Sequence, residues 1–117
     1  MLFAISATSG PIDPTKAELP FIFAASALQD GDGVMIMLFH DAVHMATKGT
    51  AEKIIPFGPP KRFQEVIDHQ NSEIWVCKPC VDVRCIPLEM LASEIKVGGM
   101  NDFHLAAKHH DARVVNF

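Results

Sequence analysis

The three cysteines of this 117-residue chain lie in one short stretch, as Cys77, Cys80 and Cys85. An odd, clustered set of cysteines does not predict the disulfide framework of a secreted protein. The residues that precede Asp13 contain no basic segment and no cleavage-like stretch of a secretory signal. The cluster therefore predicts a chemical site, in a protein that we expect in the cytoplasm.

The spacing of the cysteines favours a reactive thiol. Cys77 ends a predicted buried strand, and Pro79 suits the first position of a helix. Cys80 is then expected near the N-terminus of that helix, where backbone N–H groups and the helix dipole stabilise a thiolate. Lys78 and Arg84 are nearby cations that also favour the thiolate, whereas the carboxylate of Asp82 disfavours it. This environment favours nucleophilic sulfur chemistry.

Three kinds of chemistry fit these cysteines. One cysteine accepts sulfur as a persulfide and hands it on, which is the interpretation we favour. Alternatively, Cys77 and Cys80 cycle between dithiol and disulfide, although in thioredoxin-like proteins such a motif follows the first strand of the core, not the third. A third possibility is zinc bound by all three cysteines with His40 or His44. For Cys85 alone we favour simple burial as a small hydrophobe.

His40 is the histidine most suited to the same site, because it ends a predicted central strand. It fits a proton shuttle or a hydrogen-bond partner of a persulfide, or else a polar strand end that faces water. His44 follows one helical turn later and is the second candidate. The other histidines are predicted on helix surfaces or helix ends, as His69, His104, His109 and His110.

The elements that must position these residues alternate between strands and helices. Apolar runs predict five strands, at Leu2–Ala7, Val34–Phe39, Glu73–Cys77, Ile95–Val97 and Arg113–Phe117. The first helix is predicted from Thr15 to Leu28, with Pro20 either bending it or moving its start to Leu19. Asp41 is expected to cap a helix at Ala42–Lys48, and Asn101 is expected to cap a helix that continues to about His109. Further helical segments are predicted at Lys61–His69, from about Cys80, and as a turn in Pro87–Ala92. Pro56–Pro60 is a predicted loop.

This alternation predicts the α/β class, with a parallel sheet covered by helices on both faces. Right-handed crossovers then place the functional loops at the C-terminal edge of the sheet. His40 and Cys77 each end a strand at that edge, so we expect them to lie close together although they are far apart in the sequence.

Composition limits the class of protein. Hydrophobic residues make up 49% of the chain and charged residues 21%, which predicts one folded domain over residues 1–117. The net charge is −4 and there is no run of lysine or arginine, so we expect no nucleic-acid partner. The longest apolar stretches, Phe21–Leu28 and Val34–Phe39, are far shorter than the ~20 residues that span a membrane.

The cysteine stretch also resembles a known family. From Cys77 to Ile86 it is similar to the C-G-x-C-x-x-x-R-G pattern of the DsrE/DsrF-like (YchN-like) sulfur-relay proteins, with matches at Cys77, Cys80, Arg84 and Ile86. The surrounding strands look like those of the family over nearly the whole chain. Two residues depart from the pattern, because Lys78 and Cys85 stand where the family has glycine.

The resemblance implies a three-layer α/β/α sandwich with a five-stranded parallel sheet, and assembly into homo-oligomers, either trimers or hexamers. It also implies that sulfur is carried at the cysteine that ends the third strand, which is Cys77 here.

We therefore expect a small sulfur-carrier or sulfurtransferase-like protein without a cofactor, whose partner is a sulfur-donor or sulfur-acceptor protein. Cys77 would carry the sulfur, Cys80 would attack or resolve the persulfide, and Arg84 would assist electrostatically or pair with Asp82, with His40 as a further site residue. The alternative is a non-catalytic oligomeric binding protein with a metal or small ligand at the cysteines and histidines.

Overall fold

The apolar runs of the sequence lie side by side in one parallel sheet. The structure is a computed structural model, and it describes residues 1–54 and 61–117. Its strands are β1 (Leu2–Ala7), β2 (Gly33–Leu38), β3 (Ser72–Cys77), β4 (Lys96–Gly98) and β5 (Ala112–Asn116), in the spatial order β4-β3-β2-β1-β5. All neighbouring strands are parallel. The predicted α/β class and five-stranded sheet are confirmed.

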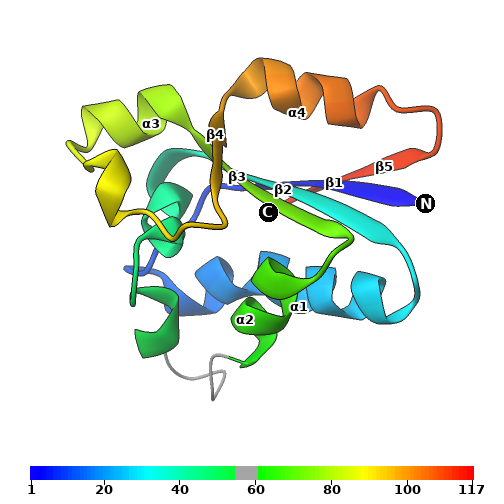
Figure 1. Cartoon of the computed structure of the whole chain (residues 1–117), viewed down its shortest axis with the longest axis horizontal. Coiled ribbons are helices and arrows are strands. Elements are labelled where there is room, and N and C mark those ends of the chain that lie inside the picture. Colours follow the sequence, from blue (N-terminus) through cyan, green and yellow to red (C-terminus); the bar gives the residue numbers. More distant parts are fainter. Residues whose placement is uncertain (55–60) are drawn as a thin grey trace.

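Helices cover both faces of this sheet (Figure 1). On one face, α1 (Pro14–Gln29) packs against α2 (Lys61–Asp68) and against β1 and β2, while α4 (Met100–Ala107) crosses the opposite face over β1, β2 and β5. The short α3 (Lys78–Val83) follows β3 directly, and 3-10 turns occur at His40–Ala46, Ala51–Lys53 and Leu88–Met90. The three predicted layers are thus confirmed, and the predicted loop at Pro56–Pro60 lies outside the described residues.

The hydrophobic core lies between the sheet and the two helices α1 and α2. Ile36 and Leu38 of β2 and Ile74 and Val76 of β3 point to this side and are almost completely buried, as is Phe21 of α1. The face under α4 is covered less well. None of the residues of α4, β4 and β5, all within the described part of the chain, is buried.

Pro20 lies inside α1 and does not mark its beginning. The helix starts at Pro14 and continues through Pro20 to Gln29, so a start near Leu19 is wrong. A proline inside a helix removes one backbone hydrogen bond and costs roughly 3 kcal/mol. Pro20 is fully buried together with Phe21, and this packing offsets the lost bond.

Two predicted helix starts are also wrong. The segment after β2 is a 3-10 helix over His40–Ala46 whose N-cap is Phe39, so Asp41 lies inside the first turn and caps nothing. The short helix expected at Cys80 is present, since α3 begins at Lys78 with Pro79 in its first turn and Cys80 near its N-terminus. The last helix is capped by Gly99, whose N–H donates to the Asp102 carboxylate at 2.9 Å, and not by Asn101.

Gly98 is packed tightly at the point where β4 lies beside the end of β3. It pairs with Cys77 in the register of the sheet. A Cβ atom on Gly98 would overlap the Asp102 carboxylate and would lie 2.8 Å from the Trp75 ring. Gly99, the next residue, has extended backbone and open space around its Cβ position.

The same substitution at these two glycines is therefore expected to have opposite consequences. Gly98→Ser should lower the free energy of unfolding by about 1–3 kcal/mol, because the Trp75 ring and Asp102 must move. Gly99→Ser should change it by less than about 0.5 kcal/mol, since serine is a good helix N-cap. Urea denaturation of both variants measures this, and equal losses would contradict the close packing at Gly98.

Candidate functional site

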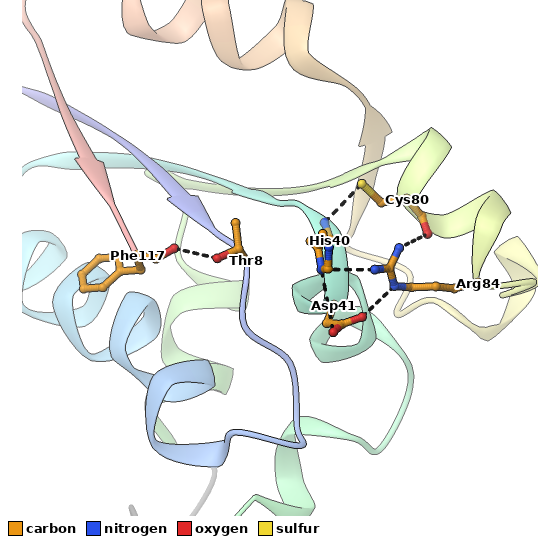
Figure 2. A network of polar contacts seen from close by, with 6 residues as sticks. All are labelled: Thr8, His40, Asp41, Cys80, Arg84 and Phe117. Atoms are coloured by element: carbon orange, nitrogen blue, oxygen red, sulfur yellow. Dashed lines mark hydrogen bonds and ion pairs between the residues drawn. The ribbon is translucent and has the colours of Figure 1, made fainter.

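The strand ends form one edge of the sheet, where segments far apart in the sequence meet. β2 ends at Leu38 and β3 ends at Cys77, and these strands are neighbours. The segment after β2 therefore lies beside α3, and the backbone N–H of His40 donates to the sulfur of Cys80 at 3.1 Å (Figure 2). The end of β1 belongs to the same edge, where the Thr8 hydroxyl donates to the Phe117 carbonyl.

Arg84 connects the two segments. Its Nε donates to Oδ1 of Asp41 at 2.9 Å, and its Nη1 donates to the backbone carbonyl of Cys80 at 3.1 Å. Its Nη2 lies 3.2 Å from Nδ1 of His40. Because a guanidinium has only donors, Nδ1 accepts this last bond. One largely covered side chain thus holds the loop after β2 against α3 (Figure 2).

Asp41 is the site residue that the sequence interpretation missed, because its position suggested a helix cap. Its carboxylate binds Arg84, and this bond is the main reason that the pKa of Asp41 lies below its ordinary value. Asp82, the expected partner of Arg84, instead binds the ammonium of Lys78 with both oxygens at 2.8 Å. The sequence did contain a signal for this role of Asp41. An acidic residue stands next to His40 at a strand end, and Arg84 requires a negatively charged partner.

The two cysteines of the C-x-x-C motif have different surroundings. Cys77 has only 8% of its surface exposed, while Cys80 is partly exposed. Burial is the main cause that raises the pKa of the Cys77 thiol, and its contact with the Cys80 thiol adds to this. The N–H of Cys80 and the charge of Arg84 lower the same pKa, but the net direction is upward.

His44 and Cys85 do not join the four residues His40, Asp41, Cys80 and Arg84. His44 lines a cavity of about 190 Å³ together with Asp41 and residues of the loop from Gly10 to Ile12. Within residues 1–54 and 61–117, no three histidine, cysteine or acidic side chains are grouped as a metal ion requires. The zinc interpretation of the cluster is therefore not favoured.

Comparison with known proteins identifies the family of this chain. The model of the DsrE/DsrF-like family matches residues 1–117. The chain belongs to the DsrE/DsrF-like family.

Relatives of this family member share its fold. The crystal structure of the ychN protein from E. coli superposes with a TM-score of 0.80 at 20% identity, and the comparison covers 99% of this chain and 97% of that one. MTH1491 from Methanobacterium thermoautotrophicum has a TM-score of 0.72 at 9% identity, over 99% and 96% of the two chains. In sequence, protein MK0008 of Methanopyrus kandleri is 25% identical over 107 residues, which are 89% of this chain and 84% of that protein.

No helix among the described residues combines the length and apolar character needed to cross a bilayer.

Cys85 stands where the family resemblance places a glycine, and its backbone has the conformation that glycine favours. Its φ is +55°, in the left-handed region that favours glycine. The Cys85 N–H donates to the carbonyl of Asp82, and the Ile86 N–H donates to that of Val81, which is the Schellman arrangement at the end of α3. The Cys85 side chain is exposed, so the expected burial is wrong.

Glycine at position 85 is expected to stabilise the protein. Cys85→Gly should raise the free energy of unfolding by about 0.5–1 kcal/mol. Glycine removes the strain of the left-handed backbone, and this gain is only partly offset by the larger conformational entropy that glycine loses on folding. Cys85→Ser keeps the strain and should bring no gain. Urea denaturation under reducing conditions compares the two, and a glycine variant no more stable than the serine variant would contradict the assignment.

Proposed function

We propose that this chain is a sulfur carrier, which accepts sulfane sulfur as a cysteine persulfide and passes it to a partner protein. Membership of the DsrE/DsrF-like family suggests a sulfur-relay role. The observation that carries the proposal is the pair of neighbouring thiols at this sheet edge, where the partly exposed Cys80 sulfur accepts the His40 N–H and Arg84 binds the Cys80 backbone carbonyl. A backbone N–H that donates to a sulfur stabilises negative charge there.

The reaction needs no cofactor and no net oxidation. A thiolate of the chain attacks the outer sulfur of a donor persulfide, R–S–SH, and a new S–S bond forms as the S–S bond of the donor breaks. The electron pair of the broken bond leaves with R–S⁻, and the chain holds Cys–S–SH. A thiolate of the acceptor repeats the attack on the outer sulfur, and the cysteine of the chain leaves as the thiolate.

A protein partner fits the surface next to the site. Val83, at the end of α3, is 75% exposed, and the following turn exposes Leu88 and Met90. Val83 directly precedes Arg84, and Leu88 and Met90 follow it by four and six residues, so a partner that covers them would lie against α3 and the turn after it. Exposed apolar side chains beside a reactive group are typical of protein interaction sites.

Assembly into a homo-oligomer belongs to the same proposal. The thinly covered side of the sheet exposes Met100 and Leu105 on α4 and Val114 on the neighbouring β5. These residues lie on α4 and β5, whereas Val83, Leu88 and Met90 lie on α3 and in the turn after it. The proposal therefore assigns copies of the chain to the first surface and the sulfur partner to the second.

Intact-protein mass spectrometry tests sulfur acceptance. After treatment with inorganic polysulfide, the wild-type chain should gain one sulfur atom that a reductant removes. The variant with both Cys77→Ser and Cys80→Ser should gain none, while Cys85→Gly, which changes an exposed thiol outside the site, should gain sulfur as the wild type does. A wild type without added sulfur, or a double variant that still gains it, would contradict the proposal.

The role of Arg84 is tested by comparing two cations of the same region. Arg84→Gln should slow sulfur uptake roughly tenfold. The variant loses hydrogen bonds of a charged group, each worth about 1.5–3 kcal/mol, that fix the segment after β2 against α3. Lys78→Gln should change the rate less than about twofold, since the Lys78 ammonium is exposed and bound by Asp82. Circular dichroism checks that both variants are folded. Equal rates for the two variants would show that Arg84 has no special role.

A further inference from the structure

His40 reaches the thiol pair with its backbone and not with its ring. Its N–H donates to the Cys80 sulfur at 3.1 Å, whereas its Nδ1 lies 3.2 Å from Nη2 of Arg84 and 3.7 Å from Oδ2 of Asp41 (Figure 2). Within residues 1–54 and 61–117, no hydrogen bond joins the imidazole to a cysteine sulfur. The group that His40 offers to the sulfur is therefore one that every residue except proline possesses.

The direction of this N–H depends on an unusual backbone conformation. The φ of His40 is +55°, in the left-handed region that favours glycine, and other residues keep such a backbone only where surrounding contacts hold it. Arg84 supplies these contacts, because its guanidinium binds the His40 ring, the Asp41 carboxylate and the Cys80 carbonyl. The bond of Arg84 to the carbonyl positions α3, while the hydrogen bond to the sulfur itself comes from His40.

The Cys80 sulfur lies next to a thiol that keeps its proton. Cys77 is the N-cap residue of α3 and Cys80 is the third residue of that helix, a spacing at which the later side chain reaches back toward the N-cap. Burial raises the pKa of the Cys77 thiol, and its contact with the Cys80 thiol adds to this. Cys77 must lose this proton before its sulfur can attack a donor, and the Cys80 sulfur is a neighbouring group that can accept it.

We propose that His40 is a positioning residue whose backbone N–H stabilises negative charge on the Cys80 sulfur, and that this sulfur takes the proton of Cys77 when Cys77 accepts sulfur. The inference rests on the proposed carrier function and keeps Cys77 as the carrier. It gives the backbone N–H, and not the imidazole, the part of His40 in the reaction.

The proposed step balances in atoms and charge. Cys77–SH, Cys80–S⁻ and a donor persulfide R–S–SH give Cys77–S–SH, Cys80–SH and R–S⁻. The Cys77 sulfur bonds to the outer sulfur of the donor, and the Cys77 proton passes to Cys80. The electron pair of the broken donor S–S bond leaves with R–S⁻.

Two variants that both lack the imidazole separate the backbone from the ring. Glycine adopts left-handed backbone without steric cost, whereas the β-branched valine is an outlier there. His40→Gly should therefore take up sulfur from inorganic polysulfide roughly fivefold faster than His40→Val at neutral pH, since only the valine variant loses the hydrogen bond to the sulfur. Equal rates in the two variants would overturn the inference.

The position of the added sulfur separates this inference from the carrier function. The wild-type chain is treated with inorganic polysulfide, alkylated, and fragmented in a tandem mass spectrometer, and the extra sulfur is expected mainly on Cys77. Extra sulfur mainly on Cys80 would overturn the inference and leave the carrier function standing. A wild type without extra sulfur on either cysteine would overturn the carrier function.

The pH dependence of uptake separates proton transfer from a general loss of structure. The difference between His40→Gly and His40→Val should shrink to less than half between about pH 7 and about pH 10, because the Cys77 thiol increasingly ionises without help from Cys80. Circular dichroism confirms that both variants are folded at each pH. A difference that stays the same at every pH would overturn the proposed proton transfer.

The coupling between Arg84 and His40 gives a measurement that does not use the valine variant. Glycine populates left-handed backbone without the contacts that Arg84 supplies, so adding Arg84→Gln to His40→Gly should slow uptake less than about threefold. In the wild-type chain, Arg84→Gln is expected to slow it roughly tenfold. The full tenfold loss in the glycine variant would overturn the inference, because Arg84 would then act without the His40 backbone.

Discussion

The guanidinium of Arg84 is the interaction on which the arrangement of the site depends. It binds a carboxylate and an imidazole from the segment after β2 and a carbonyl from α3. Left-handed backbone at a residue other than glycine persists only where surrounding contacts hold it. The bonds of Arg84 supply such contacts for His40, and they thereby keep the His40 N–H at the Cys80 sulfur. The Asp41 carboxylate balances the guanidinium charge, which allows a largely covered arginine at this place.

The parallel sheet supplies the framework for this contact. Parallel strands all end at one edge, so residues that follow β2 and β3 meet there even though about forty positions separate them in the chain. The core beneath α1 and α2 is densely apolar and holds these strands in register. The face under α4 is covered less well, and it leaves apolar side chains of α4 and β5 exposed.

The chemistry of the site follows from an asymmetry between neighbouring thiols. One turn of helix separates Cys77 from Cys80, yet the first is enclosed at the end of a strand and the second reaches solvent. Burial penalises a thiolate, while an amide N–H that donates to the sulfur stabilises it. Two chemically identical side chains thereby have different environments at one edge of the sheet.

Much of the fold could be predicted from the sequence, because apolar runs such as Val34–Phe39 and the alternation with helices depend on local pattern. Local pattern also misled in specific places. Asp41 has the residue type of a helix cap, but an arginine more than forty residues away competes for its carboxylate. Pro20 has the residue type of a helix start, but burial against the core compensates the missing hydrogen bond.

The sequence by itself determined the class of fold, the family resemblance and the stretch in which the chemistry lies. Only the tertiary structure decided which thiols are exposed, which acidic residue binds Arg84, and that Cys85 lies in left-handed backbone. The physical reason is that exposure, ion pairing and left-handed backbone depend on neighbours from distant parts of the chain. Residue type and spacing along one segment do not contain that information.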